Sequence, residues 1–455
     1  MKGILDGGVN VVRINFSHND EKDHLKRIKA IRQYEKDNDT FIGILMDLQG
    51  PKIRISSFKN NKVKLSLGDQ FTLDADLPEM EGDQEAVGIA YKELPNDLNA
   101  GNILLLDDGK IILKVDRIKN SKIFTTVIQA GTLYNNKGIN LRGGGLSASA
   151  LTDKDKSDIL IAAKADADYV AISFPINADD VRETKSLLLK AGSNASVIAK
   201  IERAEALEED IITEIIQESA GIMVARGDLG VEIGDPQLPA QQKRLIQLAR
   251  ANDRFVITAT QMLESMIDAP APTRAEASDV AGAVFDGADA VMLSAETAAG
   301  QYPVEAVEFM ARIVSSAEAH VRSDPTSGPG ELPVEKSVYH AVARTSVGLA
   351  ETVEAKVMGA FSSSGNTAVR IARERPAIPF LVMTPHLEVQ RKLCLLWGTY
   401  TAASAYSDDF ESAITEAIFE IRKRGMAGTG QQVVIVAGMP FGIVGTTNSM
   451  RVVTL

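Results

Sequence analysis

Seven short apolar runs, rich in β-branched residues, alternate with longer segments that have the charged pattern of helices. The runs are VNVVRINFS (9–17), FIGILMDL (41–48), DYVAISF (168–174), SVIAKIE (196–202), GIMVARGD (221–228), FVITATQ (255–261) and DAVMLSAET (289–297). Near-continuous apolar strands separated by helices are typical of a parallel sheet that is covered on both faces. Polar residues end each run, as they do around the rim of a barrel. We therefore expect an α/β fold with a (β/α)8-type TIM barrel, while a doubly wound open sheet remains the alternative.

Two stretches interrupt this pattern. Residues 55–148 change to short alternating strands with the hairpin signals GDQ and DDGK, which predicts a small β domain inserted between a first barrel part, 1–54, and a second part, 149–322. Residues 323–333, SDPTSGPGELP, have the composition of a linker. Residues 334–455 return to α/β alternation, which predicts a third domain with a parallel-rich sheet.

Charge and cysteine content restrict the class of protein. The 455 residues include 49 Lys+Arg and 61 Asp+Glu, a formal net charge of -12. This balance argues against a nucleic-acid or membrane partner, because binding either anionic surface needs a basic face. The single cysteine, Cys394, excludes an internal disulfide framework and a Cys-rich metal site. With no signal-like N-terminus and no apolar run of 18 residues, we expect a cytoplasmic protein.

Charged and hydroxyl side chains collect where the predicted strands end, which is where a barrel builds its active site. Lys200 and Glu202 lie two residues apart, so on a strand their side chains face the same way. Glu202 and Asp228 suit Mg²⁺, which takes one or two carboxylates and completes its shell with waters and substrate oxygens. Lys200 could then stabilise a transferring phosphoryl group or an enolate oxygen. Gly227 would let backbone amides approach a substrate carboxylate.

Each of these residues also has a purely structural interpretation. A Lys-x-Glu pair on a strand can be a simple ion pair, and GDLG can be an ordinary turn. Arg13 could tether a helix C-terminus, and Thr260 or Ser294 could be hydroxyls satisfied inside the barrel. Their combination at successive strand ends favours the functional interpretation.

Seven collinear motifs resemble those of the pyruvate kinase family: VVRINFSH, DLQGPKIR, AKIERAE, MVARGDLGVEI, TATQMLESM, PTRAEASDVA and MLSAETAAGQYP. The resemblance covers essentially the whole chain in the same domain order, and the wording DLQGPKIR and KGINLRGGGLS is most similar to one bacterial branch. It implies transfer of the phosphoryl group of phosphoenolpyruvate to ADP, giving pyruvate and ATP, with Mg²⁺, for which Mn²⁺ can substitute. It also implies a homotetramer.

The resemblance implies roles for the matched residues. Arg13 would hold the phosphoryl group, and Lys200 would stabilise that group in the transition state. The metal would be bound by Glu202 and Asp228, and the carboxylate end of the substrate by Gly227, Asp228 and Thr260.

For the nucleotide and the proton the resemblance implies two further groups. The nucleotide would face Asn15, Phe16, Ser17, His18, Arg54 and Lys137, the last contributed by the β domain acting as a lid. Thr260, with Ser294 and Glu296 behind it, would relay the proton that converts enolpyruvate to pyruvate.

A second candidate phosphate site lies in the third domain, at FSSSGNTA (361–368) between a predicted strand and a predicted helix. Amides and hydroxyls there could form a nest for an anion. In the resembled family this region binds a sugar-phosphate effector; the alternative is a plain Ser or Asn helix cap. The predicted effector residues are Ser362, Ser363, Ser364, Gly365, Asn366 and Thr367. The glycine-bearing loop at 438–448 has a similar character.

The chain departs from the family pattern in two places. The family begins with a strand of the type TKI-V-TIGPAS and this chain starts after it, so we expect seven of the eight barrel strands. Many members carry glutamate where this chain has Lys52, and a K⁺ ion then sits near the matches of Asn15, Ser17, Asp47 and the carbonyl of Leu48. A tethered ammonium could supply the same charge, so we expect no K⁺ requirement. The alternative is a surface lysine paired with Asp47.

Two other functions fit part of the sequence. A Mg²⁺-dependent aldolase or lyase acting on pyruvate enolate would use Lys200, Glu202 and Asp228, but it leaves the β domain and Lys137 without a role. A sugar-phosphate-binding protein with an inactive, truncated barrel would use only the third domain.

Overall fold

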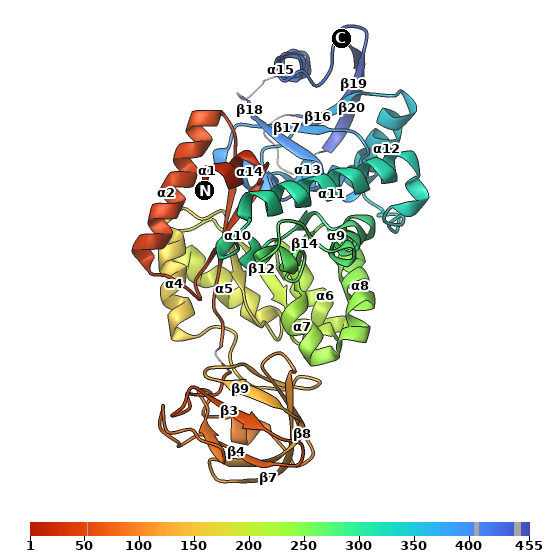
Figure 1. Cartoon of the computed structure of the whole chain (residues 1–455). Helices are drawn as coiled ribbons and strands as arrows, with labels where there is room; N and C mark the ends of the chain where they lie inside the picture. Colours follow the sequence, from red (N-terminus) through yellow and green to blue (C-terminus); the bar gives the residue numbers. More distant parts are fainter. Residues whose placement is uncertain (52, 405–408, 441–446) are drawn as a thin grey trace.

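The structure is a computed structural model, and it describes residues 1–51, 53–404, 409–440 and 447–455. Lys52 and much of the loop at 438–448 therefore lie outside the described residues. Figure 1 shows the inserted β domain at one end, the barrel in the middle and the C-terminal α/β domain at the other end.

The central sheet forms the wall of the barrel. Its strands, in spatial order, are β1 (Val11–Asn15), β2 (Gly43–Asp47), β11 (Tyr169–Ile172), β12 (Ser196–Ile201), β13 (Gly221–Ala225), β14 (Phe255–Ala259) and β15 (Ala290–Val291). All neighbours in this order pair in parallel. The spatial order equals the order in the chain, which a doubly wound sheet does not have. The barrel prediction and its count of seven strands are thus confirmed.

Helices surround this sheet (Figure 1). The longer ones are α2 (Glu21–Asn38), α4 (Asp153–Lys164), α5 (Ala178–Lys190), α6 (Glu209–Glu218), α8 (Leu238–Ala251), α9 (Arg274–Asp286) and α11 (Pro303–Ser323). Shorter ones are α1 (Lys2–Asp6), α7 (Arg226–Ile233), α10 (Ala295–Ala298), η1 (Glu205–Leu207), η2 (Asp235–Gln237) and η3 (Glu264–Ile267). Several begin at sequence-encoded caps: Thr152 and Asp155 form a capping box at α4, as Thr273 and Glu276 do at α9.

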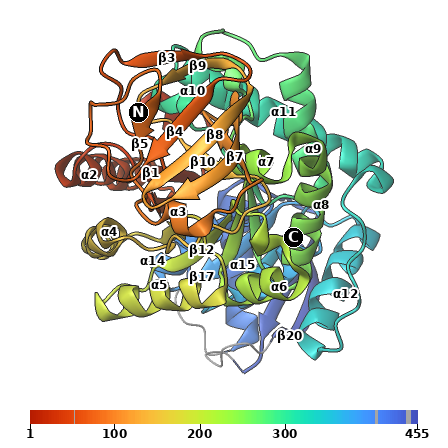
Figure 2. The ribbon, with the colours of Figure 1, turned by 90° about the horizontal axis from the view of Figure 1, so that it is seen from below.

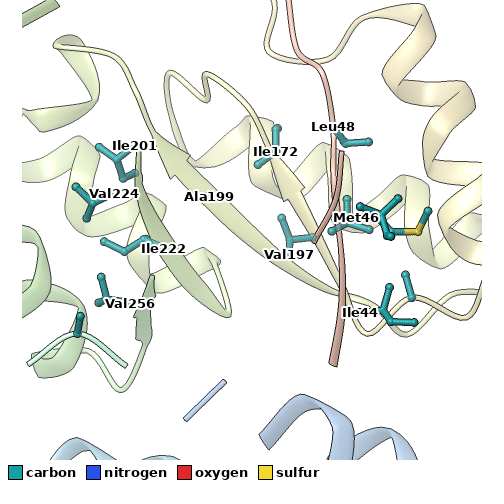
Figure 3. Close-up of a cluster of buried hydrophobic side chains, with 14 of the residues drawn as sticks. Ile44, Met46, Leu48, Ile172, Val197, Ala199, Ile201, Ile222, Val224 and Val256 are labelled. Atoms are coloured by element: carbon teal, nitrogen blue, oxygen red, sulfur yellow. The ribbon is translucent and has the colours of Figure 1, made fainter. Parts of the chain in front are cut away.

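Side chains alternate between the two faces of the sheet along each strand, and this alternation decides which residues lie on each face. Ile44, Met46 and Leu48 belong to the core cluster beneath the helices (Figure 3), together with Val197, Ala199 and Ile201 of β12. The alternate residues Leu45 and Ile198 belong to a second cluster, on the opposite face. Since side chains two apart face alike, Asp47 follows Leu45 and Lys200 follows Ile198 onto that inner face.

The inserted domain is antiparallel for the most part and has a hydrophobic core of its own. Its six-stranded sheet runs β10 (Ile139–Leu141), β6 (Ile103–Leu106), β7 (Ile111–Lys119), β8 (Lys122–Gln129), β4 (Gln70–Asp74) and β5 (Ala86–Gly88). Strands β3 (Lys62–Leu65) and β9 (Gly131–Tyr134) form a separate pair, and α3 (Leu94–Asp97) is the short helix of this domain. Viewed from below, the domain lies in front of part of the barrel (Figure 2).

The C-terminal domain is a five-stranded sheet in the order β18 (Thr399–Ala403), β17 (Phe380–Thr384), β16 (Val357–Phe361), β19 (Gln432–Gly438) and β20 (Thr447–Thr454), of which β20 alone is antiparallel. Its helices are α12 (Val338–Thr352), α13 (Asn366–Arg373), α14 (Leu387–Leu393) and α15 (Phe410–Lys423), and η4 (Pro325–Ser327) precedes them. Ion pairs such as Arg391–Glu35, at 2.8 Å, join the domain to the barrel. Across the described parts of the chain, no helix is both long and apolar enough to cross a membrane.

Candidate active site

A buried ion cluster lies at the carboxyl ends of the inner strands. Asp47 ends β2, and its Oδ2 is 2.6 Å from both Nε and Nη2 of Arg13 on the neighbouring strand β1. Its Oδ1 is 3.4 Å from the ammonium of Lys200. Burial raises the pKa of Asp47, but the charges of Lys200 and Arg13 outweigh burial, and the pKa is below its usual range. Asp47 is therefore an anion that two cations share.

Lys200 forms ion pairs and a hydrogen bond with residues at the ends of its own and nearby strands of the barrel. Its Nζ lies 2.9 Å from Oε1 of Glu202 and donates to Oγ of Ser173 at 2.8 Å. Burial lowers the pKa of Lys200, yet the attraction of Asp47 and Glu202 prevails, and the pKa lies above its ordinary value. A lysine so fixed stays charged and cannot act as a base.

Glu202 and Asp228 form the acidic side of the cluster. Glu202 is buried, and its Oε2 accepts a hydrogen bond from the amide of Phe174 at 2.8 Å. Burial, with repulsion from Asp228, raises the pKa of Glu202 to about 7. Burial likewise raises the pKa of Asp228, and the charge of Asp108 in the inserted domain adds to that effect. Two buried carboxylates that repel one another favour an added cation.

The donor set fits magnesium. Among the described residues no group of three or more His, Cys, Asp or Glu could hold a metal ion. Mg²⁺ binds through one or two carboxylates and keeps oxygens of water and substrate, and Glu202 and Asp228 offer that arrangement.

Thr260 follows β14 and faces the start of α7. Its Oγ1 accepts a hydrogen bond from the amide of Gly227 at 2.8 Å and donates to the carbonyl of Ala259 at 2.6 Å. Glu296 is buried and accepts from the amide of Ser294 at 2.6 Å. Within the described part of the chain, no hydrogen bond joins Ser294 or Glu296 to Thr260, so the relay predicted for them stays a prediction.

The predicted nucleotide residues lie in two places. In the barrel, the amide of Ser17 donates to Oδ1 of Asn15 at 2.9 Å, Phe16 is buried against His24, and His18 is exposed. In the inserted domain, exposed Arg54 bridges to Gly138, and the ammonium of Lys137 lies 2.9 Å from Asp107 of the same domain. Lys137 thus pairs within the lid.

Two residues at the site were not predicted. Ser173 connects Lys200 to β2, because its Oγ also donates to the carbonyl of Leu48 at 2.7 Å. Lys154 donates to the carbonyl of Phe16 at 2.9 Å and lies over its ring. Ser173 lies near the end of the predicted run 168–174 and directly follows the observed strand β11, and that position was the available signal. Lys154, in the charged run TDKDK, had none.

The predicted effector segment follows β16 and leads into α13. The amide of Ser362 donates to the carbonyl of Met383 at 3.1 Å, and Thr367 Oγ1 is 2.8 Å from Thr447 Oγ1. Gly365, with φ of 86°, is the N-cap residue, and it has no side chain with which to cap. The plain Ser or Asn cap considered from the sequence is therefore wrong for this helix. Ser364 and Asn366 are exposed.

Comparisons with known proteins give one answer along the whole chain. Residues 1–307 match the family model described as pyruvate kinase, barrel domain, and residues 340–453 match pyruvate kinase, alpha/beta domain. The chain is 47% identical to a pyruvate kinase of Buchnera aphidicola, over 99% of this chain and 94% of that protein. It is 45% identical to pyruvate kinase II of Salmonella typhimurium, over 100% and 95%.

A solved structure has the same architecture. The crystal structure of a pyruvate kinase from Cryptosporidium parvum superposes with a TM-score of 0.90 at 33% identity, and the match covers 99% of this chain and 92% of that one.

Proposed function

The chain belongs to the pyruvate kinase family, and on that premise we propose how its residues divide the reaction. The activity is that of pyruvate kinase, EC 2.7.1.40, which transfers the phosphoryl group of phosphoenolpyruvate to ADP. The observation that carries the division is the pair Arg13 and Lys200 on opposite sides of the buried Asp47, with cation side chains that are 24% and 12% exposed. Phosphoryl transfer depends on positioned cations more than on a nucleophile.

Arg13 holds the phosphoryl group before transfer, and Lys200 stabilises the charge that spreads over its oxygens in the transition state. Glu202 and Asp228 hold Mg²⁺, or Mn²⁺ in its place. When bound, the metal neutralises substrate oxygens and orients them for in-line transfer.

The remaining substrate contacts lie around the start of α7. The amides near Gly227, with Asp228 and Thr260, bind the carboxylate end of phosphoenolpyruvate. Thr260 then gives a proton to C3 of enolpyruvate, and Ser294 and Glu296 resupply that proton. The hydrogen bond from Gly227 to Thr260 supports this role, since it fixes the hydroxyl beside the substrate amides.

The nucleotide binds between barrel and lid. Asn15, Phe16, Ser17 and His18 face it from the barrel, and Arg54 and Lys137 from the inserted domain. A lid that closes over the site excludes water, which would otherwise compete for the phosphoryl group.

Monovalent cation is not required, in our proposal. The ammonium of Lys52 supplies the charge that a K⁺ ion supplies in many relatives near the matches of Asn15, Ser17, Asp47 and the carbonyl of Leu48. Its structure lies outside the described residues, and the proposal rests on the sequence. The salt bridges of Asp47 support this proposal. In the alternative, Lys52 is a surface lysine paired with Asp47, but the Asp47 carboxylate is already occupied by these salt bridges.

Regulation and assembly complete the proposal. A phosphorylated metabolite binds Ser362, Ser363, Ser364, Gly365, Asn366 and Thr367, supported by the positive φ of Gly365, which opens the helix N-terminus to an anion. The protein works as a homotetramer in the cytoplasm.

Lys200→Met tests the central assignment. Removing the charge should lower kcat about 1,000-fold or more with a normal circular dichroism spectrum, as measured by ADP-dependent pyruvate release. Pyruvate release by the wild type without ADP would instead favour the lyase alternative. Effector binding without turnover would favour the sensor alternative. A Lys200→Met enzyme with more than about a tenth of the wild-type rate would contradict the role of Lys200.

A further inference from the structure

Thr260 and Gln261 have a backbone conformation that residues of their type rarely adopt. Thr260 has φ of 67° and Gln261 has φ of 55°, so two consecutive non-glycine residues are left-handed. Thr260 is also β-branched, which makes this region particularly unfavourable. Such residues persist where surrounding contacts fix them, and they cluster at functional sites. A group that fixes Thr260 should therefore be present nearby.

Arg226 is that group. It is 6% exposed and opens α7, directly after β13. Its Nη2 donates to the carbonyls of Thr260 at 2.7 Å and Gln261 at 3.1 Å, and its Nε donates to the Thr260 carbonyl at 3.2 Å. Nη2 also lies 2.8 Å from the sulfur of Met262. One guanidinium thus contacts three consecutive residues after β14.

The far side of the guanidinium is anchored on two barrel helices. Nη1 donates to Oδ1 of Asp279 on α9 at 2.7 Å and reaches Oε1 of Gln242 on α8 at 3.5 Å. The next residue, Gly227, donates its amide to the Thr260 hydroxyl. The side chain of Arg226 therefore fixes the backbone of Thr260, while the following amide fixes its hydroxyl.

We propose that Arg226 is a positioning residue for the proton-transfer half of the reaction, through the left-handed conformation that it imposes on Thr260. This inference rests on the proposed role of Thr260. In that step the C2–O⁻ of enolpyruvate reforms its carbonyl, the electron pair of C2=C3 takes the proton, and the O–H bond of Thr260 breaks. Ser294 and Glu296, in the role given to them above, then return a proton to the threonine. Arg13 and Lys200, which carry phosphoryl transfer in the proposed function, make no hydrogen bond to Thr260 or Gln261 within the described part of the chain.

Arg226→Lys provides the main test, because lysine keeps the charge and loses the fork that binds two carbonyls. The proton half is measured as exchange of the pyruvate methyl hydrogens in ²H₂O by NMR. The phosphoryl half is measured as ATP formed in a single turnover by rapid quench. Exchange should fall about 10-fold or more, ATP formation in the single turnover should change less than about 2-fold, and the solvent deuterium isotope effect on kcat should rise.

Arg254→Lys is the matched control. Arg254 also donates to backbone carbonyls, those of Ile216, Gln217 and Asp253, but it precedes β14, at the opposite end of that strand from Thr260. It should leave the ratio of the two half-reactions unchanged. If Arg226→Lys does not fold, Asp279→Asn keeps the guanidinium and removes its anchor, and it should lower exchange about 3-fold with the same selectivity.

Two results would overturn the proposal. Equal loss of both half-reactions in Arg226→Lys would show a general structural role, and unchanged exchange would show no role. The variant Thr260→Ala distinguishes failure of the proposal for Arg226 from failure of the proposed role of Thr260. If Thr260→Ala retains exchange, Thr260 is not the proton donor and the role of Arg226 falls with it. If Thr260→Ala loses exchange while Arg226→Lys retains it, only the proposal for Arg226 is refuted.

Discussion

Replacing Glu232 with glutamine should change how the stability of this protein depends on pH. Glu232 lies in α7, is 6% exposed, and accepts a hydrogen bond from the amide of Ala204 at 2.7 Å. Burial, with the nearby charge of Glu205, raises the pKa of Glu232 from an ordinary 4.5 to about 7. The folded protein therefore holds a proton there in a pH range where the unfolded chain has lost it.

The magnitude follows from linkage. A group whose pKa is higher in the folded state contributes most below its unfolded pKa, and the contribution is lost as pH rises toward the folded value. Each pKa unit is worth about 1.4 kcal/mol, so between 4.5 and about 7 the wild type should lose about 3 kcal/mol through Glu232. Glutamine keeps the acceptor for Ala204 and does not ionise.

Urea unfolding of both proteins, followed by circular dichroism from about pH 5 to about pH 8, measures the effect. Other buried carboxylates, including Glu202, titrate in the same range, but they are present in both proteins and cancel in the difference. At about pH 8, the free energy of unfolding of Glu232→Gln relative to that of the wild type should be about 3 kcal/mol higher than at about pH 5. Parallel pH profiles would refute the reasoning, because they would mean that Glu232 ionises in the folded protein as readily as in the unfolded chain.

Three further outcomes test the proposed site. Lys52→Glu should make activity dependent on K⁺, with the wild type active in its absence; a wild type that already depends steeply on K⁺, or a variant that does not, contradicts the proposal. Ser364→Ala should reduce activation by a phosphorylated metabolite without changing the unactivated rate, and unchanged activation would count against the effector site. Asp47→Asn should lower the free energy of unfolding by about 3 kcal/mol, because it leaves two partly buried cations without their shared anion; an unchanged urea midpoint would show that Arg13 and Lys200 find other partners.

Strand parity explains why much of the site could be predicted from the sequence. Lys200 and Glu202 were expected to face the same way because they are two apart; β12 ends at Ile201, just before Glu202, and the structure still places Nζ 2.9 Å from Oε1. Asp47 and Asp228 follow strands whose apolar runs were plain in the sequence. Parallel strands end at one rim of a barrel, so their following residues had to meet there.

Contacts between distant segments could not be predicted in this way. The guanidinium of Arg226 binds the carbonyl of Thr260, 34 positions later, and the sequence pattern gives neither the reach of that side chain nor the left-handed backbone that it meets. The helix cap before α13 shows a similar limit. The run Ser-Ser-Ser-Gly-Asn offers several capping residues, and the structure uses Gly365 because the chain needs a positive φ there.

The balance of charge in the site explains why cations are so tightly held in an acidic protein. Arg13 and Lys200 face three carboxylates, those of Asp47, Glu202 and Asp228. A site of this composition has one negative charge in excess when all five groups are ionised, and it repels a phosphorylated anion until a divalent cation reverses the sign. Metal binding should therefore strengthen the binding of phosphoenolpyruvate, and phosphoenolpyruvate should strengthen that of the metal by the same factor, because coupling between two bound ligands is reciprocal. Asp47 allows Arg13 and Lys200 to lie close together in the site, since without its negative charge the two cations would repel one another.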